Sequence, residues 1–170
     1  MVLGAAASGG QANAALLVAG LAVLLLHAAV NVANDYFDHL SGGDAGNTQR
    51  LFPFTGGSRF IQNHVMTPRA TLLLAVSLFA ATAVLGGGLV WQGGGVIAAL
   101  GGAGAALGWA YSAPPLRLNG RGWGELTVAL TFWGVPLGAA QVVAGHIAPA
   151  VVWLGGSYAP ICDFDLLMAA

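Results

Sequence analysis

The chain has 170 residues, of which 57% are hydrophobic and 6% charged, and its mean hydropathy is +0.78. Because soluble domains carry about 25% charged residues, this composition excludes a soluble globular protein. The net charge is −1, with five arginines and no lysine, so no broad basic surface exists and we predict no nucleic-acid partner. A single cysteine, Cys162, cannot form an internal disulfide.

Residues 1–13 contain no lysine or arginine, which excludes a secretory signal with a basic front end. Apolar runs follow at Ala14–Val32, Ala70–Trp91, Val96–Tyr111, Leu126–Ala144 and Ile147–Tyr158. Most are long enough for membrane helices, which need about 20 residues, although the third and last are short. They exceed the usual strand of about 5 to 6 residues. We predict an all-α, multi-pass bundle with about five crossings.

Glycine is abundant inside the apolar runs, with 27 residues in the chain. Gly104 and Gly108 have GxxxG spacing, as do Gly134 and Gly138. Small residues allow helix backbones to approach closely in lipid. The pattern therefore predicts close helix packing, in preference to a ligand-binding role.

All five arginines lie in two loops, residues 40–69 and 112–125. Two predicted crossings separate these loops, so both must emerge on the same side of the membrane. The positive-inside rule places both in the cytoplasm, and we expect the chain in the inner (plasma) membrane. Four of the six carboxylates lie at or in the same loops, which suits an enzyme acting on an amphipathic substrate with a charged head.

A polar stripe lies at the end of the first predicted crossing. His27, Asn31, Asn34, Asp35 and Asp38 fall within an arc of roughly 100° on a helix. Two neighbouring carboxylates repel each other unless a cation lies between them, and Mg²⁺ is the usual ion where phosphates complete its shell. The stripe therefore predicts a magnesium site.

Asp44 follows Gly42 and Gly43, and the turn that glycine permits could bring it to the same ion. The alternative is structural: the stripe would hydrogen-bond to neighbouring helices, with Asp38 and Asp44 solvated at the helix end. We favour function for Asp35 and Asp38, because ionisable groups at the edge of a span are costly. For Asp44 the two interpretations are equal, and for His27 the structural one is favoured.

The second loop carries Arg117 and Arg121 between Pro114 and Glu125. Pro114 ends the preceding helix, and the glycines of the loop permit an irregular return. The planar guanidinium group suits phosphate oxygens bidentately. The two arginines thus either bind a substrate phosphate or anchor the loop at lipid headgroups.

Three motifs stand in order along the chain: NDYFD at residues 34–38 followed by Asp44, PFTGGSR at 53–59, and YSAPPLR at 111–117 with GWGE at 122–125. Together they resemble the UbiA-type intramembrane prenyltransferases. The 1,4-dihydroxy-2-naphthoate polyprenyltransferase branch, which serves menaquinone biosynthesis, is the most similar. The resemblance runs from about Val2 to about Tyr158 and implies Mg²⁺-dependent transfer of a polyprenyl group from its diphosphate to an aromatic acceptor.

The resemblance also implies roles for the matching residues. The metal ligands, of which the first two are also the catalytic residues, would be Asp35, Asp38 and Asp44. The residues that bind the substrate diphosphate would be Asn34, Arg59, Tyr111, Ser112, Arg117 and Arg121. Arg117 stands where many members have lysine, and the spacing of Asp44 from Asp38 is that of the naphthoate branch.

The family has roughly nine helices and a second Asp-rich motif, neither of which this sequence matches in full. Asp163 and Asp165 alternate and do not share a helix face, so residues 161–170 are read as a divergent tail. We therefore expect a single partial prenyltransferase domain over residues 1–170, which alone binds at most one Mg²⁺ and has little or no activity.

A rival prediction from another class is a small multi-pass membrane transporter or assembly subunit. The Asn31–Asp38 stripe would then be an ion or proton site. Such a protein has no need of arginines opposite the aspartates, and this favours the enzyme.

Overall fold

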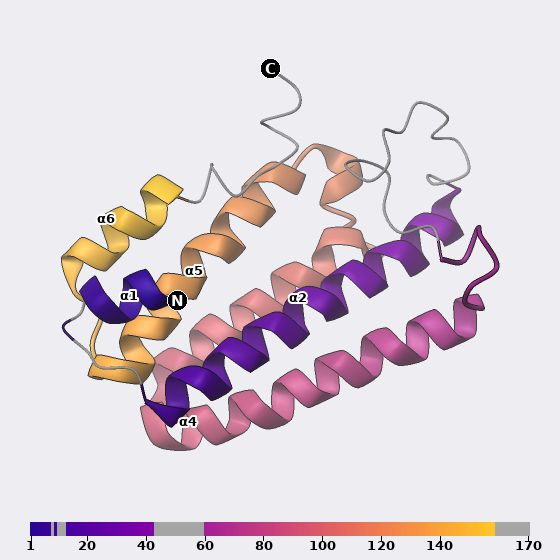
Figure 1. The fold of residues 1–170 in the computed structure, drawn as a ribbon. Coiled ribbons are helices and arrows are strands. Elements are labelled where there is room, and N and C mark those ends of the chain that lie inside the picture. Colours follow the sequence, from indigo (N-terminus) through magenta and orange to yellow (C-terminus); the bar gives the residue numbers. More distant parts are fainter. Residues whose placement is uncertain (8, 10–12, 43–59, 159–170) are drawn as a thin grey trace.

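The structure is a computed structural model, and it describes residues 1–7, 9, 13–42 and 60–158. Within these residues the chain is helical (Figure 1). The α-helices are α1 (Val2–Ala7), α2 (Ala14–Ser41), α4 (Pro68–Ser112), α5 (Gly124–Ala144) and α6 (Pro149–Tyr158), and a short 3₁₀ helix, η1, covers Asn119–Arg121. The predicted all-α architecture is confirmed.

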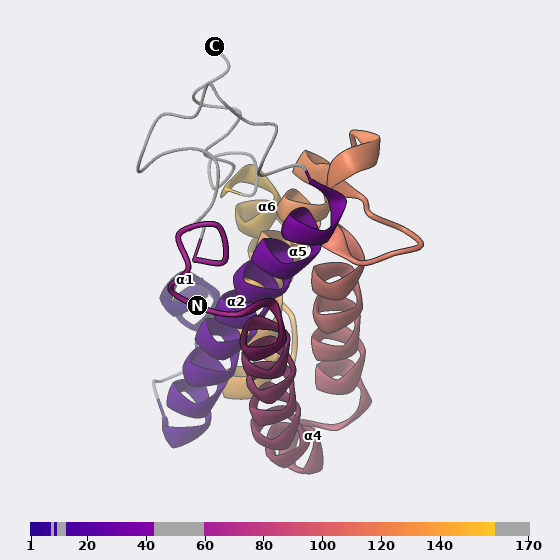
Figure 2. The same ribbon diagram turned by 90° about the vertical axis from the view of Figure 1, so that its right-hand side faces the viewer.

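Helix α4 consists of two halves that run in opposite directions (Figure 2). The reversal is at Gly94, whose φ of 73° and ψ of −163° are non-helical and favour glycine. The halves, Pro68–Gln92 and Gly94–Ser112, correspond to the second and third apolar runs of the sequence. Two separate apolar helices, each long enough to cross a membrane, are therefore confirmed where the sequence predicted them.

In the part of the chain that the structure describes, four helical segments are long and apolar enough to cross a membrane: α2, the two halves of α4, and α5. Helix α6 has ten residues and spans about 15 Å, half of the roughly 30 Å hydrocarbon core. It lies back along α5, where the Trp133 indole donates to the Val152 carbonyl at 3.0 Å. Over the described residues, the fifth apolar run thus forms a helix that is shorter than a bilayer crossing.

Small residues bring α2 close to the second half of α4. On α2, Ala29 and Ala33 are fully buried. On α4, a Cβ added at Gly108 would lie 2.4 Å from Cγ2 of Val30, and one added at Gly104 would lie 3.7 Å from Cδ2 of Leu26. The predicted packing role of this GxxxG pair is therefore confirmed.

The second GxxxG pair behaves differently. A Cβ added at Gly134 or Gly138 would meet no atom within 4 Å in the described part of the chain. Close approach on α5 occurs instead beside Pro136, where a Cβ added at Gly4 of α1 would lie 2.2 Å from the Pro136 carbonyl oxygen. Helix α1 therefore packs directly against the backbone of α5.

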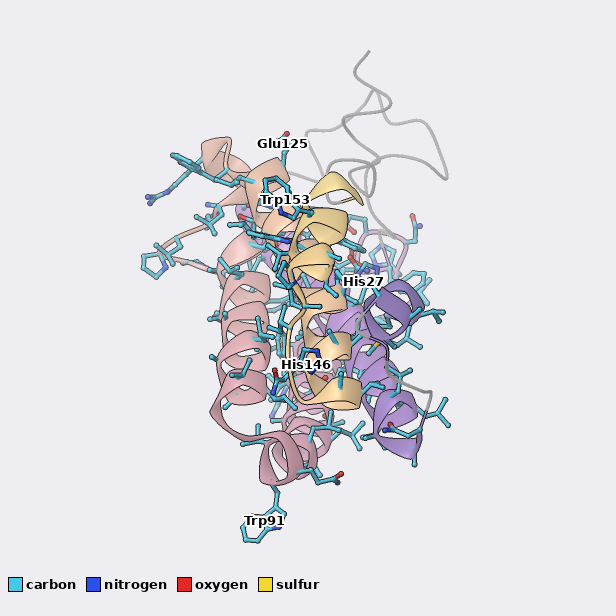
Figure 3. All side chains as sticks on the ribbon, turned by 90° about the vertical axis from the view of Figure 1, so that its left-hand side faces the viewer. His27, Trp91, Glu125, His146 and Trp153 are labelled. Carbon is cyan, nitrogen blue, oxygen red and sulfur yellow. The ribbon has the colours of Figure 1, made fainter. Side chains whose placement is uncertain are left out.

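The two ends of the bundle differ in chemistry. Trp91 is 93% exposed at the end where α4 reverses, and Glu125 lies at the opposite end (Figure 3). Arg117, Arg121 and the 54% exposed Trp123 are in the loop that leads into α5 at the Glu125 end. Exposed tryptophans at both ends match the aromatic belts of membrane proteins. The charged loop between α4 and α5 is thus at one membrane surface.

Candidate functional site

Asn34 joins the two polar segments that the sequence singled out. Its side-chain nitrogen donates to Oδ2 of Asp38 at 2.8 Å, one turn further along α2. Its side-chain oxygen accepts from the hydroxyl of Ser112 at 2.5 Å, and Ser112 is the last residue of α4. The end of α2 and the start of the arginine loop therefore meet at this one side chain.

A second contact to Asn34 comes from the loop itself. Nδ2 of Asn119, the first residue of η1, lies 3.4 Å from Oδ1 of Asn34. Oδ1 of Asn119 accepts from the backbone N–H of Gly120 at 2.7 Å. The position of the loop relative to α2 is thus fixed by side-chain amides as well as by helix packing.

The two carboxylates predicted as metal ligands lie on the last turns of α2. Asp35 and Asp38 are both half-buried, and each has interactions within the structure. The backbone carbonyl of Asp38 accepts from the Ser41 hydroxyl at 3.0 Å, and Gly42 ends the helix in the left-handed region with φ 75°. The helix therefore ends one turn beyond Asp38, which leaves this carboxylate at the charged end of the bundle.

The loop between α4 and α5 holds its two arginines in different ways. Arg117 is exposed and adopts a φ of 44°, which is uncommon for a residue with a side chain. Arg121 is also exposed, and its guanidinium donates to the Pro115 carbonyl at 2.9 Å. Arg121 therefore stabilises the conformation of the loop. Its guanidinium group retains further N–H groups that can donate hydrogen bonds.

Tyr111 lies at the base of this loop. A Cβ added at the buried Gly124 would be 3.7 Å from the Tyr111 hydroxyl oxygen, an ordinary contact distance. The ring of Tyr111 therefore packs beside the first residue of α5. This contact brings the end of α4 and the start of α5 together below the arginines.

Aromatic rings connect α2 to both halves of α4 near this end. Trp109 lies edge-on to Phe37 of α2 at 5.5 Å between ring centroids, and to Phe79 at 5.6 Å. Such edge-to-face pairs add about 0.5–1.5 kcal/mol beyond their buried area. The site is thus supported by an aromatic cluster that ties three helical segments together.

His27 lies apart from the carboxylates. Its ring faces Phe132 of α5 edge-on at 6.2 Å between centroids (Figure 3 labels His27). On the helix it precedes Asp35 by about 12 Å. The structure therefore places His27 in a contact between α2 and α5, as the structural interpretation of this residue expected.

Two predicted site residues, Asp44 and Arg59, lie outside the described residues, as does the PFTGGSR motif. Among the described residues no group of three His, Cys, Asp or Glu side chains is placed to hold a metal ion. Mg²⁺ bound with substrate phosphates commonly takes only one or two protein carboxylates. Asp35 and Asp38 supply that number, so the donor set fits a magnesium ion that shares its shell with a diphosphate.

Asn119 was not predicted as a site residue. The only sequence signal for it is an Asn-Gly pair in a polar loop, which indicates a turn and not a partner. Its contact with Asn34 joins residues 85 positions apart. Only the packing of α4 against α2 brings it to the site.

The fold and the site define an integral membrane protein of several apolar helices, with acidic and basic groups together at one end. The sequence matches the model of the UbiA prenyltransferase family over residues 1–167, and the chain belongs to this family. UbiA-family proteins are membrane prenyltransferases, which act on a prenyl diphosphate and an aromatic acceptor. A search of curated proteins gave no match, and neither did a search of solved structures.

Proposed function

We propose that this chain transfers a polyprenyl group from its diphosphate to 1,4-dihydroxy-2-naphthoate, in a Mg²⁺-dependent reaction at the cytoplasmic face of the plasma membrane. The observation that carries the proposal is the contact of Asn34 with both Asp38 and Ser112. It brings an acidic helix end and an arginine loop together, which is the pairing that a metal-bound diphosphate requires. The naphthoate acceptor is supported by the motif resemblance.

In this proposal Asp35 and Asp38, joined by Asp44, would hold Mg²⁺. When bound, the ion supplies positive charge that stabilises the departing diphosphate. Arg117 and Arg121 would bind phosphate oxygens of the substrate, because a guanidinium can donate two parallel hydrogen bonds. Tyr111 lies at the base of the loop and would complete the diphosphate side of the site.

The reaction breaks the bond between the allylic carbon and the diphosphate oxygen. The ring carbon that bears the carboxylate forms the new carbon–carbon bond, and the carboxylate leaves as CO₂ while its bonding pair returns to the ring. Breaking this bond leaves an allylic cation, which water would quench. The apolar helices around the site exclude that water. The long exposed apolar faces of α2 and α4 would place the prenyl tail in lipid.

The test uses membrane vesicles that contain the full chain, with polyprenyl diphosphate and carboxyl-labelled 1,4-dihydroxy-2-naphthoate. Radioactive labelling allows even a low rate to be measured. We expect Mg²⁺-dependent release of labelled CO₂ with the unaltered chain and a loss of at least tenfold with Asp38→Asn. The exposed Asn63, in the turn before α4, gives the control Asn63→Ala, which should retain the full rate.

The result also separates the proposal from its rivals. If the chain transferred the prenyl group to 4-hydroxybenzoate and not to the naphthoate, the proposed acceptor would be wrong. The assignment as an aromatic prenyltransferase would stand. Equal release of labelled CO₂ by the unaltered chain and by Asp38→Asn would refute the enzyme proposal. That outcome would favour a transporter or assembly subunit with an ion site at Asn31–Asp38.

A further inference from the structure

The hydrogen bonds that lead from the arginine loop to Asp38 run in a single direction. They begin at the backbone N–H of Gly120, which donates to Oδ1 of Asn119 at 2.7 Å. A backbone N–H can only donate, so the carbonyl oxygen of the Asn119 side chain must face it. The amide nitrogen of Asn119 is thereby turned away from Gly120, and it points at Oδ1 of Asn34, 3.4 Å away.

The same logic fixes the orientation of Asn34. Its oxygen accepts from Asn119 and from the Ser112 hydroxyl, so both donors lie on one side of the amide. The amide nitrogen therefore faces the opposite side, where it donates to Oδ2 of Asp38 at 2.8 Å. The backbone conformation at Gly120 thus favours the orientation in which the amide nitrogen of Asn34, and not its oxygen, faces Oδ2 of Asp38.

Burial makes this orientation difficult to change. Ser112 is only 3% exposed, so water does not readily replace its hydroxyl at Asn34. One turn earlier on α4, Gly108 allows close contact with Val30 of α2 and keeps the two helices at this separation. A buried hydroxyl that already donates to Asn34 is better suited to support that side chain than to bind a diphosphate directly.

We propose that Ser112 and Asn119 are positioning residues that act through Asn34 to aim the Asp38 carboxylate. The inference rests on the proposed function, because it takes Asp38 to be a metal ligand there. It assigns Ser112 a different task from the diphosphate contact that the resemblance implies. It also couples the affinity of the acidic site for a divalent cation to the folded shape of the arginine loop.

The test measures binding of Mn²⁺, a paramagnetic substitute for Mg²⁺, to the full chain in lipid nanodiscs with inorganic pyrophosphate present. Loss of a residue that orients a metal ligand weakens metal affinity by about 10–100-fold. We expect Ser112→Ala to weaken Mn²⁺ binding about tenfold, and Ser112→Thr, which keeps the hydroxyl, to restore most of it. An unchanged Mn²⁺ affinity in Ser112→Ala would overturn the inference.

A matched control removes another buried hydroxyl from the same end of the bundle, at the start of α4. Thr71 is 2% exposed and its hydroxyl donates only within its own helix, to the Thr67 carbonyl at 3.1 Å. Thr71→Val should therefore leave Mn²⁺ binding unchanged. An equal loss in this control would show that the effect of Ser112→Ala is one of general stability, and this too would overturn the inference.

The route through Asn34 is tested by a double variant. If Ser112 acts through Asn34, Ser112→Ala should cost nothing further in an Asn34→Ala background, because contacting residues are non-additive. The same loss in both backgrounds would contradict the route. Asn119→Asp, which cannot donate to Asn34, should weaken Mn²⁺ binding in the same direction and gives a second variant if Ser112→Ala fails to fold.

The binding assay contains no prenyl substrate and no acceptor, so the two proposals fail separately. Mn²⁺ binding that depends on Ser112, together with equal substrate turnover by the unaltered chain and by Asp38→Asn, would refute the proposed function and support the positioning role. Prenyl transfer with no dependence of Mn²⁺ binding on Ser112 would refute the positioning role alone. No Mn²⁺ binding by the unaltered chain would contradict both.

Discussion

The Asn34 side chain donates to Asp38 at 2.8 Å and accepts from Ser112, a residue 78 positions further along the chain. One amide therefore connects an acidic helix end to the segment that carries Arg117 and Arg121. Asn34 can do this because a primary amide has a donor and an acceptor side, and the two sides face different helices. A carboxylate or an apolar side chain at this position would lose one or both connections.

The first prediction follows from this dual role. Asn34→Asp replaces the donor to Asp38 with a second negative charge, which repels the neighbouring carboxylate. We expect prenyl transfer to fall at least tenfold in the vesicle assay described above. The same substitution at the exposed Asn63 should leave transfer unchanged. Full activity of Asn34→Asp would show that the hydrogen bond to Asp38 has no role in the reaction.

The second prediction concerns the contact between α2 and α4. Gly108→Ala would place a methyl group in overlap with Cγ2 of Val30, so the Val30 side chain or the two helices must shift. Overpacking of this kind costs about 1–3 kcal/mol, and we expect a lower thermal unfolding temperature in detergent.

Two further variants test this cause. Val30→Ala should rescue Gly108→Ala, because it removes the opposing methyl groups. Gly102, on the same half of α4, has open space around its Cα, so Gly102→Ala should cost nothing. If Gly108→Ala and Gly102→Ala lowered the unfolding temperature equally, the loss of stability would come from the helix backbone and not from the contact with Val30.

Much of the fold could be predicted because the bilayer imposes it. Runs of apolar residues predicted the spans, and the interval between the runs that end at Trp91 and begin at Val96 contains Gly94, where the chain reverses. The stripe on α2 was visible because a helix places Asn34 and Asp38 on one face.

The partners across helices could not be predicted in the same way. Periodicity describes one helix at a time, so it gives no register between α2 and α4 and no contact of Asn34 with Ser112 or Asn119. For the same reason the sequence treated the two GxxxG pairs alike. Gly104 and Gly108 meet α2, whereas close packing on α5 is at Pro136. Spacing permits close approach, but the tertiary arrangement decides where it occurs.

The third prediction tests that contact with Pro136. A methyl group in Gly4→Ala would lie 2.2 Å from the Pro136 carbonyl oxygen, and a backbone atom within a helix cannot move aside. We therefore expect α1 to leave α5, with faster hydrogen exchange at residues 2–7 and unchanged exchange in α2. Gly138→Ala, two residues beyond Pro136 and with open space, should preserve the protection of α1. Slow exchange of α1 in Gly4→Ala would mean that this close approach does not hold the helix.

The last prediction concerns the orientation of the two ends of the bundle. Arg117 and Arg121 lie at one end, whereas the reversal at Gln92–Gly95 carries no charged residue. From the positive-inside rule we predict that the arginine loop faces the cytoplasm. In a Cys162→Ser background, cysteines are introduced one at a time at two exposed positions, Gln92 and Leu116. A membrane-impermeant maleimide added to intact spheroplasts should label Gln92→Cys and spare Leu116→Cys, and inverted vesicles should give the reverse. The opposite pattern would place the acidic and arginine groups outside the cell, where a prenyl diphosphate made in the cytoplasm could not reach them.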